Sequence, residues 1–276
     1  MGNVLLLSPT DSDAATLAAS SAVSTLPVAN LQTIQPQKKW RSGGTTESIT
    51  IQAASALVWN AACLVGHNLT SAATIRVRGG TTAGNVTAAP TVDTGAVSAW
   101  PATGKPTVAN WPNYLSLVTW ATPIALQYWR LDIADAGNAA GYLEAGRLVI
   151  GKSWQPAFNF DGTGSPIAFD TMDTQTKTAF GYLYTSRGPQ SPARMFNLQI
   201  SGTDQRDVLD GISEIQRLRG NWGDVICCLD PTATTDFHRY SLQGVFVAKP
   251  DYPIYQQFGS DGAAMYGAKI QLNELL

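Results

Sequence analysis

The sequence of 276 residues contains little charge. Only 14% of its residues are charged and its net charge is −2, whereas typical soluble domains contain about 25% charged residues. So few charges leave little room for the i,i+4 ion pairs that support long exposed helices. No basic stripe is visible either, which excludes the electrostatic surface that nucleic acid requires.

Side chains that commonly act in catalysis or bind metals are also scarce, with two histidines and three cysteines in the whole chain. Cys63 and His67 have a spacing that would serve a metal only on a helix. No second Cys/His pair lies nearby, so we expect no metal site. The odd number of cysteines, with Cys227 and Cys228 adjacent, predicts buried free thiols in a reducing compartment.

The motifs of several enzyme classes are missing. The sequence contains no G-x-S-x-G nucleophile elbow, no H-E-x-x-H helix and no G-x-x-x-x-G-K phosphate loop. We therefore expect no catalytic residues, no cofactor and no enzymatic activity. No apolar run approaches the roughly 20 residues that span a bilayer, and the first residues lack the basic region of a signal peptide. We expect synthesis in a cytoplasm and no membrane insertion.

Short strand patterns separated by Gly, Pro, Asn, Ser and Thr fill the first half of the chain. Eight such segments predict a β-sandwich of the jelly-roll type over residues 1–152: 3–7, 15–20, 47–52, 56–66, 73–79, 113–120, 127–133 and 146–151. Two of them alternate clearly. In 127–133, Trp129 faces the core and Arg130 faces out; in 73–79, Ile75 and Val77 face in while Arg76 and Arg78 face out.

The second half predicts another β-sandwich or barrel, over residues 153–276. Its strand patterns lie at 166–172, 178–186, 194–201, 224–230, 240–249 and 268–276. The one good helical pattern covers residues 204–219, and its apolar stripe consists of Val208, Ile212, Ile215 and Leu218. Gly220 is in place to end the helix. We therefore predict an all-β protein with one amphipathic helix laid across its second domain.

Three aromatic side chains in and just after a long connection are candidate interaction residues. Residues 79–113 contain no convincing strand, and a loop of that length is usually functional. Trp100, Trp111 and Tyr114 are available to pack on a neighbouring subunit or to stack on a sugar, and we predict a subunit-binding arm. The alternative is that the tryptophans pack on their own domain. Trp154 follows the last strand of the first domain, and we expect it to fill the seam between the domains.

Three stretches carry a resemblance to the discoidin, or coagulation factor 5/8, type of galactose-binding-like jelly roll. They are "PVANLQTIQPQKKWRS" (27–42), "LVGHNLTSAATIRVRG" (64–79) and the pair "QYWRLDI" (127–133) and "GRLVIG" (146–151). Within them, Asn30-Leu31, Trp40-Arg41 and 128–133 match the family pattern. With "GHNL" and a second β domain ending in "QLNELL", the whole chain resembles distal-tail or minor tail proteins in the baseplate of siphovirus-like phages.

That resemblance implies a structural protein of a phage tail tip or baseplate. The second domain would form a homo-oligomeric ring, a hexamer, that joins the tail tube to the tip and contacts other tail-tip proteins. The protein would be assembled in the host bacterial cytoplasm and reside in the virion. The alternative that stays open is a carbohydrate-binding module that contacts a glycan on the host surface during adsorption.

Overall fold

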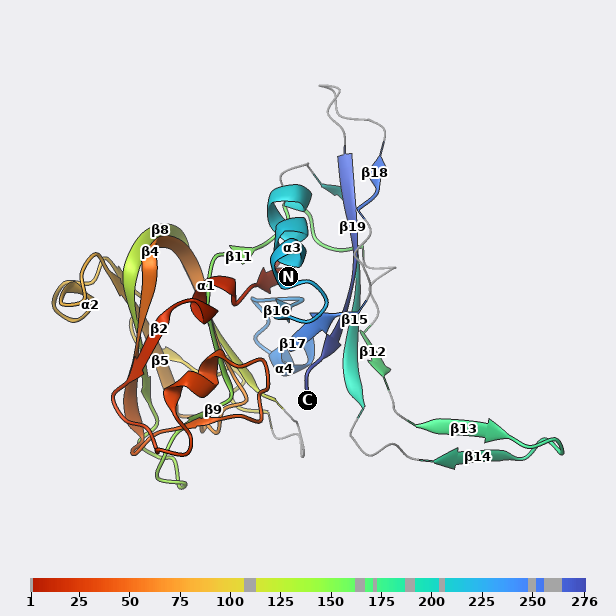
Figure 1. The fold of residues 1–276 in the computed structure, drawn as a ribbon, viewed down its shortest axis with the longest axis horizontal. Coiled ribbons are helices and arrows are strands. Elements are labelled where there is room, and N and C mark those ends of the chain that lie inside the picture. The colour runs from red at the N-terminus through yellow and green to blue at the C-terminus, as the bar shows by residue number, and fades with distance from the viewer. Residues whose placement is uncertain are drawn as a thin grey trace.

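Two large β-sheets dominate the structure and pack against each other (Figure 1). The computed structural model describes residues 2–106, 113–161, 167–170, 173–186, 192–203, 207–247, 252–255 and 265–276. A seven-stranded sheet forms the first unit and an eight-stranded sheet forms the second. The prediction of an all-β protein with a jelly-roll-like first unit is confirmed.

Two long strands build the first unit. β4 (Thr46–Val65) and β8 (Leu115–Ala134) pair antiparallel along most of their length, in the sheet order β10-β4-β8-β5-β6. Their pairing shifts register between Gln52 and Leu57 and again between Trp59 and Ala61. Bulges of this kind bend a strand, so the two long strands are expected to bend where their register shifts. The other elements are β2 (Thr16–Ala19), β3 (Trp40–Arg41), β5 (Thr74–Gly80), β6 (Val92–Asp93), β7 (Val97–Ser98), β9 (Glu144–Ala145), β10 (Arg147–Gly151), α1 (Thr10–Asp13), the 3-10 helix η1 (Val28–Gln32) and α2 (Asn85–Ala88).

Tryptophans fill the core of the jelly roll. Trp129 lies between Trp59 and Trp120, with ring centroids 5.4 Å and 5.2 Å away. Trp129, Leu131 and Ile133 are buried, as the alternation of that strand predicted. Such aromatic stacks stabilise a core beyond the area they bury, which explains why the chain places a tryptophan on this strand.

The second unit is a sheet in the order β11-β1-β16-β17-β19-β15-β12, with β18 paired to β19. Its strands are β1 (Leu5–Leu7), β11 (Ser153–Trp154), β12 (Ile167–Asp170), β15 (Ala193–Thr203), β16 (Asp224–Cys228), β17 (Ser241–Phe246), β18 (Ile254–Tyr255) and β19 (Met265–Glu274). The short helix α4 (Phe237–Tyr240) connects β16 to β17. A separate two-stranded hairpin, β13 (Thr174–Lys177) and β14 (Leu183–Ser186), projects away from the sheet (Figure 1).

The predicted helix is present with a different geometry. It begins as a π-helix, η2 (Asp207–Ser213), and continues as α3 (Glu214–Arg219); residues 204–206 lie outside the described residues. Val208, Ile212 and Ile215 pack into the core of the second unit, as predicted. Leu218 is 42% exposed, so its place on the buried stripe was predicted wrongly. The wider π turn changes the phase of the helix, and a strict 3.6-residue period cannot anticipate that change.

β1 belongs to the second sheet although it lies at the start of the first predicted domain. Leu6 pairs with both Trp154 and Cys227. The division into residues 1–152 and 153–276 does not accommodate this strand, because β1 fills the place between β11 and β16. The division of the chain into two domains at residue 152 otherwise stays a prediction.

The seam between the two units has an apolar core of its own. Leu5, Leu7, Ile226 and Cys228 face the jelly roll and pack against Ala61, Cys63, Val65, Leu115 and Val149. Their neighbours Leu6 and Cys227 face the core of the second unit instead, because adjacent residues of a strand point to opposite sides. All three cysteines are buried and free. Burial raises the pKa of each thiol, so the thiols stay protonated and unreactive.

A buried ionic cluster crosses the same seam. Arg147 on β10 donates to Asp13 on α1 at 2.6 Å and to Asp224 on β16 at 2.9 Å. Arg219 at the end of α3 contacts the same two carboxylates, at 3.2 Å and 2.8 Å. Two guanidinium groups and two carboxylates therefore neutralise each other, which is the condition under which buried charges are tolerated. The cluster ties both units together.

Candidate functional site

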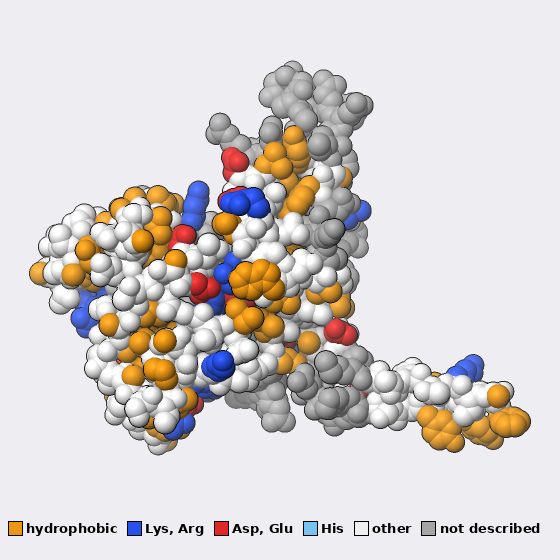
Figure 2. Space-filling view, in the orientation of Figure 1, with side chains coloured by type: hydrophobic (Ala, Val, Ile, Leu, Met, Phe, Trp, Pro, Cys, Tyr) orange, Lys and Arg blue, Asp and Glu red, His pale blue; other side chains and the backbone are white. Residues whose placement is uncertain are grey.

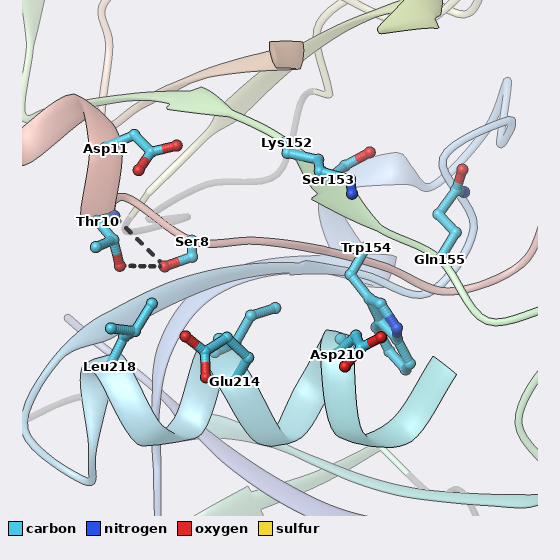
Figure 3. A pocket seen from close by; sticks show the side chains of 12 residues that line it. Ser8, Thr10, Asp11, Lys152, Ser153, Trp154, Gln155, Asp210, Glu214 and Leu218 are labelled. Carbon is cyan, nitrogen blue, oxygen red and sulfur yellow. Dashed lines mark hydrogen bonds between the residues drawn. The ribbon is translucent and has the colours of Figure 1, made fainter. Parts of the chain in front are cut away.

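Three surface features are candidates for function, and the largest is a cleft at the seam. This seam cleft has a volume of about 490 Å³ and is lined by Ser8, Thr10, Asp11, Lys152, Ser153, Trp154, Gln155, Asp210, Gly211, Glu214, Ile215 and Leu218. In Figure 3, Asp210, Glu214 and Leu218 lie along the helix, and Trp154 points toward that helix from β11. Clefts between domains are common ligand sites.

Trp154 is held in the seam cleft by the helix beneath it. A Cβ atom added at Gly211 would lie 1.9 Å from Nε1 of Trp154, so only glycine lets the indole pack this closely. Trp154 is half-buried and packs on the core of the second unit. The structure thus packs Trp154 on the second unit beside the seam cleft, and its predicted role in filling the seam between the domains stays a prediction.

The charges in the seam cleft are mainly acidic. Asp11, Asp210 and Glu214 line it together with one cation, Lys152. Hydrogen bonds from the Arg217 guanidinium lower the pKa of the Glu214 carboxyl. Asp11 accepts a hydrogen bond from Nε1 of Trp59 at 3.1 Å. The lining offers hydrogen-bonding groups from carboxylates, hydroxyls and an amide. An indole adds one aromatic surface. This combination suits a polar ligand.

The second feature is a shallow groove of about 370 Å³ on the outward face of the jelly-roll sheet. This arginine groove is lined by Ser20, Thr46, Glu47, Ser48, Thr74, Arg76, Arg78, Ala96, Arg130, Asp132, Ile133 and Ala134. The register of three strands brings them together: Asp132 on β8 lies opposite Ser48 on β4 and opposite Arg76 on β5. The alternation of 73–79 and 127–133 predicted the outward direction of the three arginines, but not that they meet.

Two aspartates partly neutralise the arginine groove. Asp132 accepts hydrogen bonds from Arg78 at 2.7 Å and from Arg130 at 2.7 Å. Asp93, beside the groove, accepts from two nitrogens of Arg76, and these bonds lower the pKa of Asp93 to about 2. Glu47 lies at one end, where its carboxylate accepts hydrogen bonds from the hydroxyl groups of Ser20 and Ser21.

The third feature is the projecting hairpin of β13 and β14, here called the hairpin arm (residues 174–186). Every residue of both strands is exposed. Its turn is closed by a hydrogen bond from Thr178 N to Tyr182 O at 2.8 Å, with Gly181 at a φ of 87°. Phe180 is 89% exposed, and Tyr182, Leu183 and Tyr184 are 60–70% exposed. Apolar side chains gather at the end of the arm in Figure 2.

The pattern of 178–186 predicts a single strand, so the sequence does not predict the hairpin arm. The signal was Gly181 between aromatic residues, since glycine supplies the positive φ that a tight turn requires. The preceding strand, "TQTK" in β13, contains no apolar residue. It therefore shows no alternation of apolar and polar residues, and the sequence predicts no strand that could pair with β14.

Trp100 lies in the jelly-roll core and not on a loop tip. It is 5% exposed, and its Nε1 donates to the carbonyl of Thr70 at 2.7 Å. His67 and Tyr114 contact its ring edge-on at centroid distances of 5.1 Å and 5.2 Å. Over residues 79–106, the predicted arm is therefore wrong: this segment folds back on its own sheet through α2, β6 and β7.

The other predicted interaction residues are placed differently. Tyr114 is half-buried, and its hydroxyl donates to the carbonyl of Pro106 at 3.3 Å. Trp111 lies outside the described residues, so its interaction role stays a prediction. His67 is buried and its Nε2 lies 2.8 Å from Oγ of Ser116.

Two observations bear on metal sites and membrane spans. Across the described residues, no three His, Cys, Asp or Glu side chains gather so as to hold a metal ion. In the same parts of the chain, none of the helices has the length and hydropathy needed to cross a bilayer.

Comparison with known proteins gives only distant structural neighbours. No protein-family model matches the chain, and no curated protein matches it. Chitosan-binding module 1 of a chitosanase/glucanase from Paenibacillus sp. IK-5 is 15% identical with a TM-score of 0.35, and the alignment covers 50% of this chain and 94% of the module. A fucolectin from the serum of striped bass, Morone saxatilis, is 7% identical with a TM-score of 0.40 and coverage of 97% and 96%.

A third neighbour has a different role. The N-terminal domain of a single-strand break repair protein is 15% identical with a TM-score of 0.38, and the alignment covers 55% of this chain and all of that domain, 100%. The three neighbours are thus a carbohydrate-binding module, a lectin and a repair domain, and no tail protein is among them. Scores this low carry no conclusion about ligands, and one sandwich fold serves many functions.

Proposed function

We propose that the protein is a non-catalytic structural component that joins a larger assembly through its hairpin arm. The observation that carries this proposal is the exposure of Phe180, Tyr182, Leu183 and Tyr184 on a hairpin outside both sheets. An isolated two-stranded hairpin is marginally stable in water. Clustered exposed aromatic side chains are typical of protein interaction sites. A partner that covers the end of the arm would supply the packing that the arm lacks.

The strand before the hairpin arm supports the same proposal. β12 is the last strand of the second sheet, and Phe169 on it is 63% exposed. An edge strand with exposed apolar side chains is a ready template for pairing with another chain. The sparse charge of the sequence fits a protein with much of its surface packed against other proteins.

The finer proposal is a homo-oligomeric ring in the tail tip or baseplate of a phage. It rests on the motif resemblance of 27–42, 64–79, 127–133 and 146–151, and on the hairpin arm as a means of joining subunits. In this proposal the second unit forms the ring, a hexamer, and contacts the tail tube and other tail-tip proteins. The protein then resides in the virion. Mass spectrometry of purified virions tests the location, and absence of the chain from virions contradicts it.

The oligomeric state in solution tests the role of the arm. The variant with Phe180→Ser and Tyr184→Ser should lose assembly in native mass spectrometry, with or without tail partners, while its melting temperature stays within a few degrees of the wild type. Trp222→Ser is the matched control, because Trp222 is 68% exposed but lies outside the arm. Assembly that survives in the double variant, or that fails equally in Trp222→Ser, contradicts the proposal.

A second candidate function is glycan binding at the seam cleft. The observation that favours it is that Trp154 points toward the helix that bears Asp210 and Glu214, and all three line one cleft. Indole surfaces and amide or carboxylate oxygens suit the apolar faces and hydroxyl groups of a neutral sugar. In the tail, such a cleft would serve contact with the host surface during adsorption.

A glycan array probed with the full chain tests this second function. The fragment 1–152 is unsuitable, because β1 would lose its partner β16. We expect binding to a neutral glycan that falls at least tenfold in Asp210→Ala and Glu214→Ala. Lys177→Ala, on the hairpin arm, is the control. No array binding, or binding unaffected by both variants, contradicts a glycan site in the seam cleft.

A further inference from the structure

Two arginine side chains lie opposite each other in the arginine groove, although such a pair lowers the stability of the sheet. Arg78 on β5 and Arg130 on β8 are direct cross-strand partners, and like charges in such positions destabilise a sheet. Asp132 lies two residues from Arg130 and accepts hydrogen bonds from both guanidinium groups. One carboxylate thus holds two guanidinium groups side by side, with Arg78 8% exposed and the side chain of Arg130 29% exposed. Three of the chain's 18 basic residues line this one groove.

The internal ion pairs leave donors unused. Arg130 donates to Asp132 through Nε, and among the described residues its two terminal nitrogens have no partner. Arg78 uses Nε and Nη2, and Arg76 uses Nε and Nη2 for Asp93, so Nη1 of each has no partner among the described residues. A planar guanidinium binds a carboxylate through two parallel hydrogen bonds. Because Asp132 fixes the orientation of Arg78 and Arg130, these donors are held in place before a ligand arrives.

The remaining polar lining consists of hydroxyl groups and the carboxylate of Glu47. Thr46 and Ser48 lie on β4 and Thr74 lies on β5, on either side of Asp132. Hydroxyls donate and accept hydrogen bonds, so they complement a ligand that is itself rich in hydroxyl groups. No aromatic side chain lines this groove, which makes stacking on the face of a neutral sugar an unsuitable mode of binding here.

We propose that the arginine groove binds an acidic saccharide, with a carboxylate of a uronic acid unit held by the free nitrogens of Arg130 and Arg78. The sugar hydroxyls contact Thr46, Ser48 and Thr74. Glu47, at the end of the groove, is engaged by Ser20 and Ser21 and leaves the centre to the guanidinium groups. This site depends neither on the hairpin arm nor on the seam cleft.

Isothermal titration of the full chain with oligomers of galacturonic and glucuronic acid tests the proposal. Each acidic oligomer is compared with its carboxyl-reduced counterpart, which keeps the hydroxyls and loses the charge. We expect binding of an acidic oligomer, at least tenfold weaker binding of its reduced form, and a further loss at high salt. Arg130→Gln should weaken binding at least tenfold, and Arg76→Gln, at the margin of the groove, should weaken it less.

Arg217→Gln is the matched control, because it removes the same charge from an exposed arginine on α3 outside the groove. Its affinity should equal that of the wild type, and the oligomeric state of all three variants should be unchanged. The proposal is overturned if no acidic oligomer binds at millimolar concentration, or if the reduced form binds as well. Equal binding of free acetate or phosphate, or an equal loss in Arg217→Gln, overturns it as well.

Discussion

At the scale of single residues, His67 shows how burial fixes a protonation state. The ring lies beside Trp100 and Ser116 in the jelly-roll core. Burial, with added repulsion from Lys105 and Lys39, lowers the pKa of His67 to about 3. The fold therefore accommodates the neutral imidazole. A protonated ring would be a buried charge, and no carboxylate is among the groups that shift the pKa of His67.

The stability of the protein should fall when His67 is forced to titrate. The folded-state pKa of about 3 lies below the ordinary value of 6.5, so the unfolded chain binds the proton first. The contribution is fully present above about pH 6.5 and is lost as the pH falls toward 3. Between pH 7 and pH 5 we expect the free energy of unfolding to drop by about 2 kcal/mol, as measured by urea denaturation. In His67→Gln this part of the pH dependence should disappear; an unchanged slope would show that other groups cause it.

At the scale of elements, the helix formed by η2 and α3 separates buried from exposed apolar positions. Ile212 is fully buried in the second core, whereas Leu218 is 42% exposed. Ile212→Ala should lower the free energy of unfolding by about 2 to 5 kcal/mol through lost burial and a cavity. Leu218→Ala should change it by about 0.5 kcal/mol or less. Equal effects in chemical denaturation would mean that the helix has another orientation.

The elements also show what a sequence can and cannot predict. Alternation within one strand is local, so the inward side of Trp129 and the outward side of Arg130 could be read directly. The register that sets Arg78 opposite Arg130 depends on which strands pair, and no local pattern encodes that choice. The partner of β1 lies more than 200 residues away on β16. The turn at Gly181 could not be predicted, because the strand before it is polar on both faces and has no apolar face that would indicate a β-strand.

At the scale of the whole molecule, we expect the contacts across the seam to make the two units unfold together. Arg147 is fully buried between Asp13 and Asp224. Arg147→Met would leave the buried carboxylate of Asp224 and the half-buried carboxylate of Asp13 sharing one cation, Arg219, and should cost about 3 to 5 kcal/mol. We expect a single unfolding transition in calorimetry that shifts to lower temperature. Arg41→Met is the control.

Arg41 forms an ion pair with Glu144 at the jelly-roll surface, where its side chain is 36% exposed. Exposed pairs of this kind contribute about 1 kcal/mol or less, so Arg41→Met should have a small effect. If both variants lose the same stability, the seam cluster contributes no more than a surface pair. Two separate transitions in the wild type would show that the units unfold independently.

The position of β1 has a consequence for the order of events on the ribosome. Leu6 is synthesised 221 residues before its partner Cys227, which corresponds to about 10 to 45 s of translation at 5 to 20 residues per second. During that interval the jelly-roll strands and β11 emerge, so Leu5 and Leu7 can pack on the jelly roll and Leu6 can pair with Trp154. The other edge of β1 stays without β16 until residue 228 has been made, and this unpaired edge is where we expect a chaperone to act on the nascent chain.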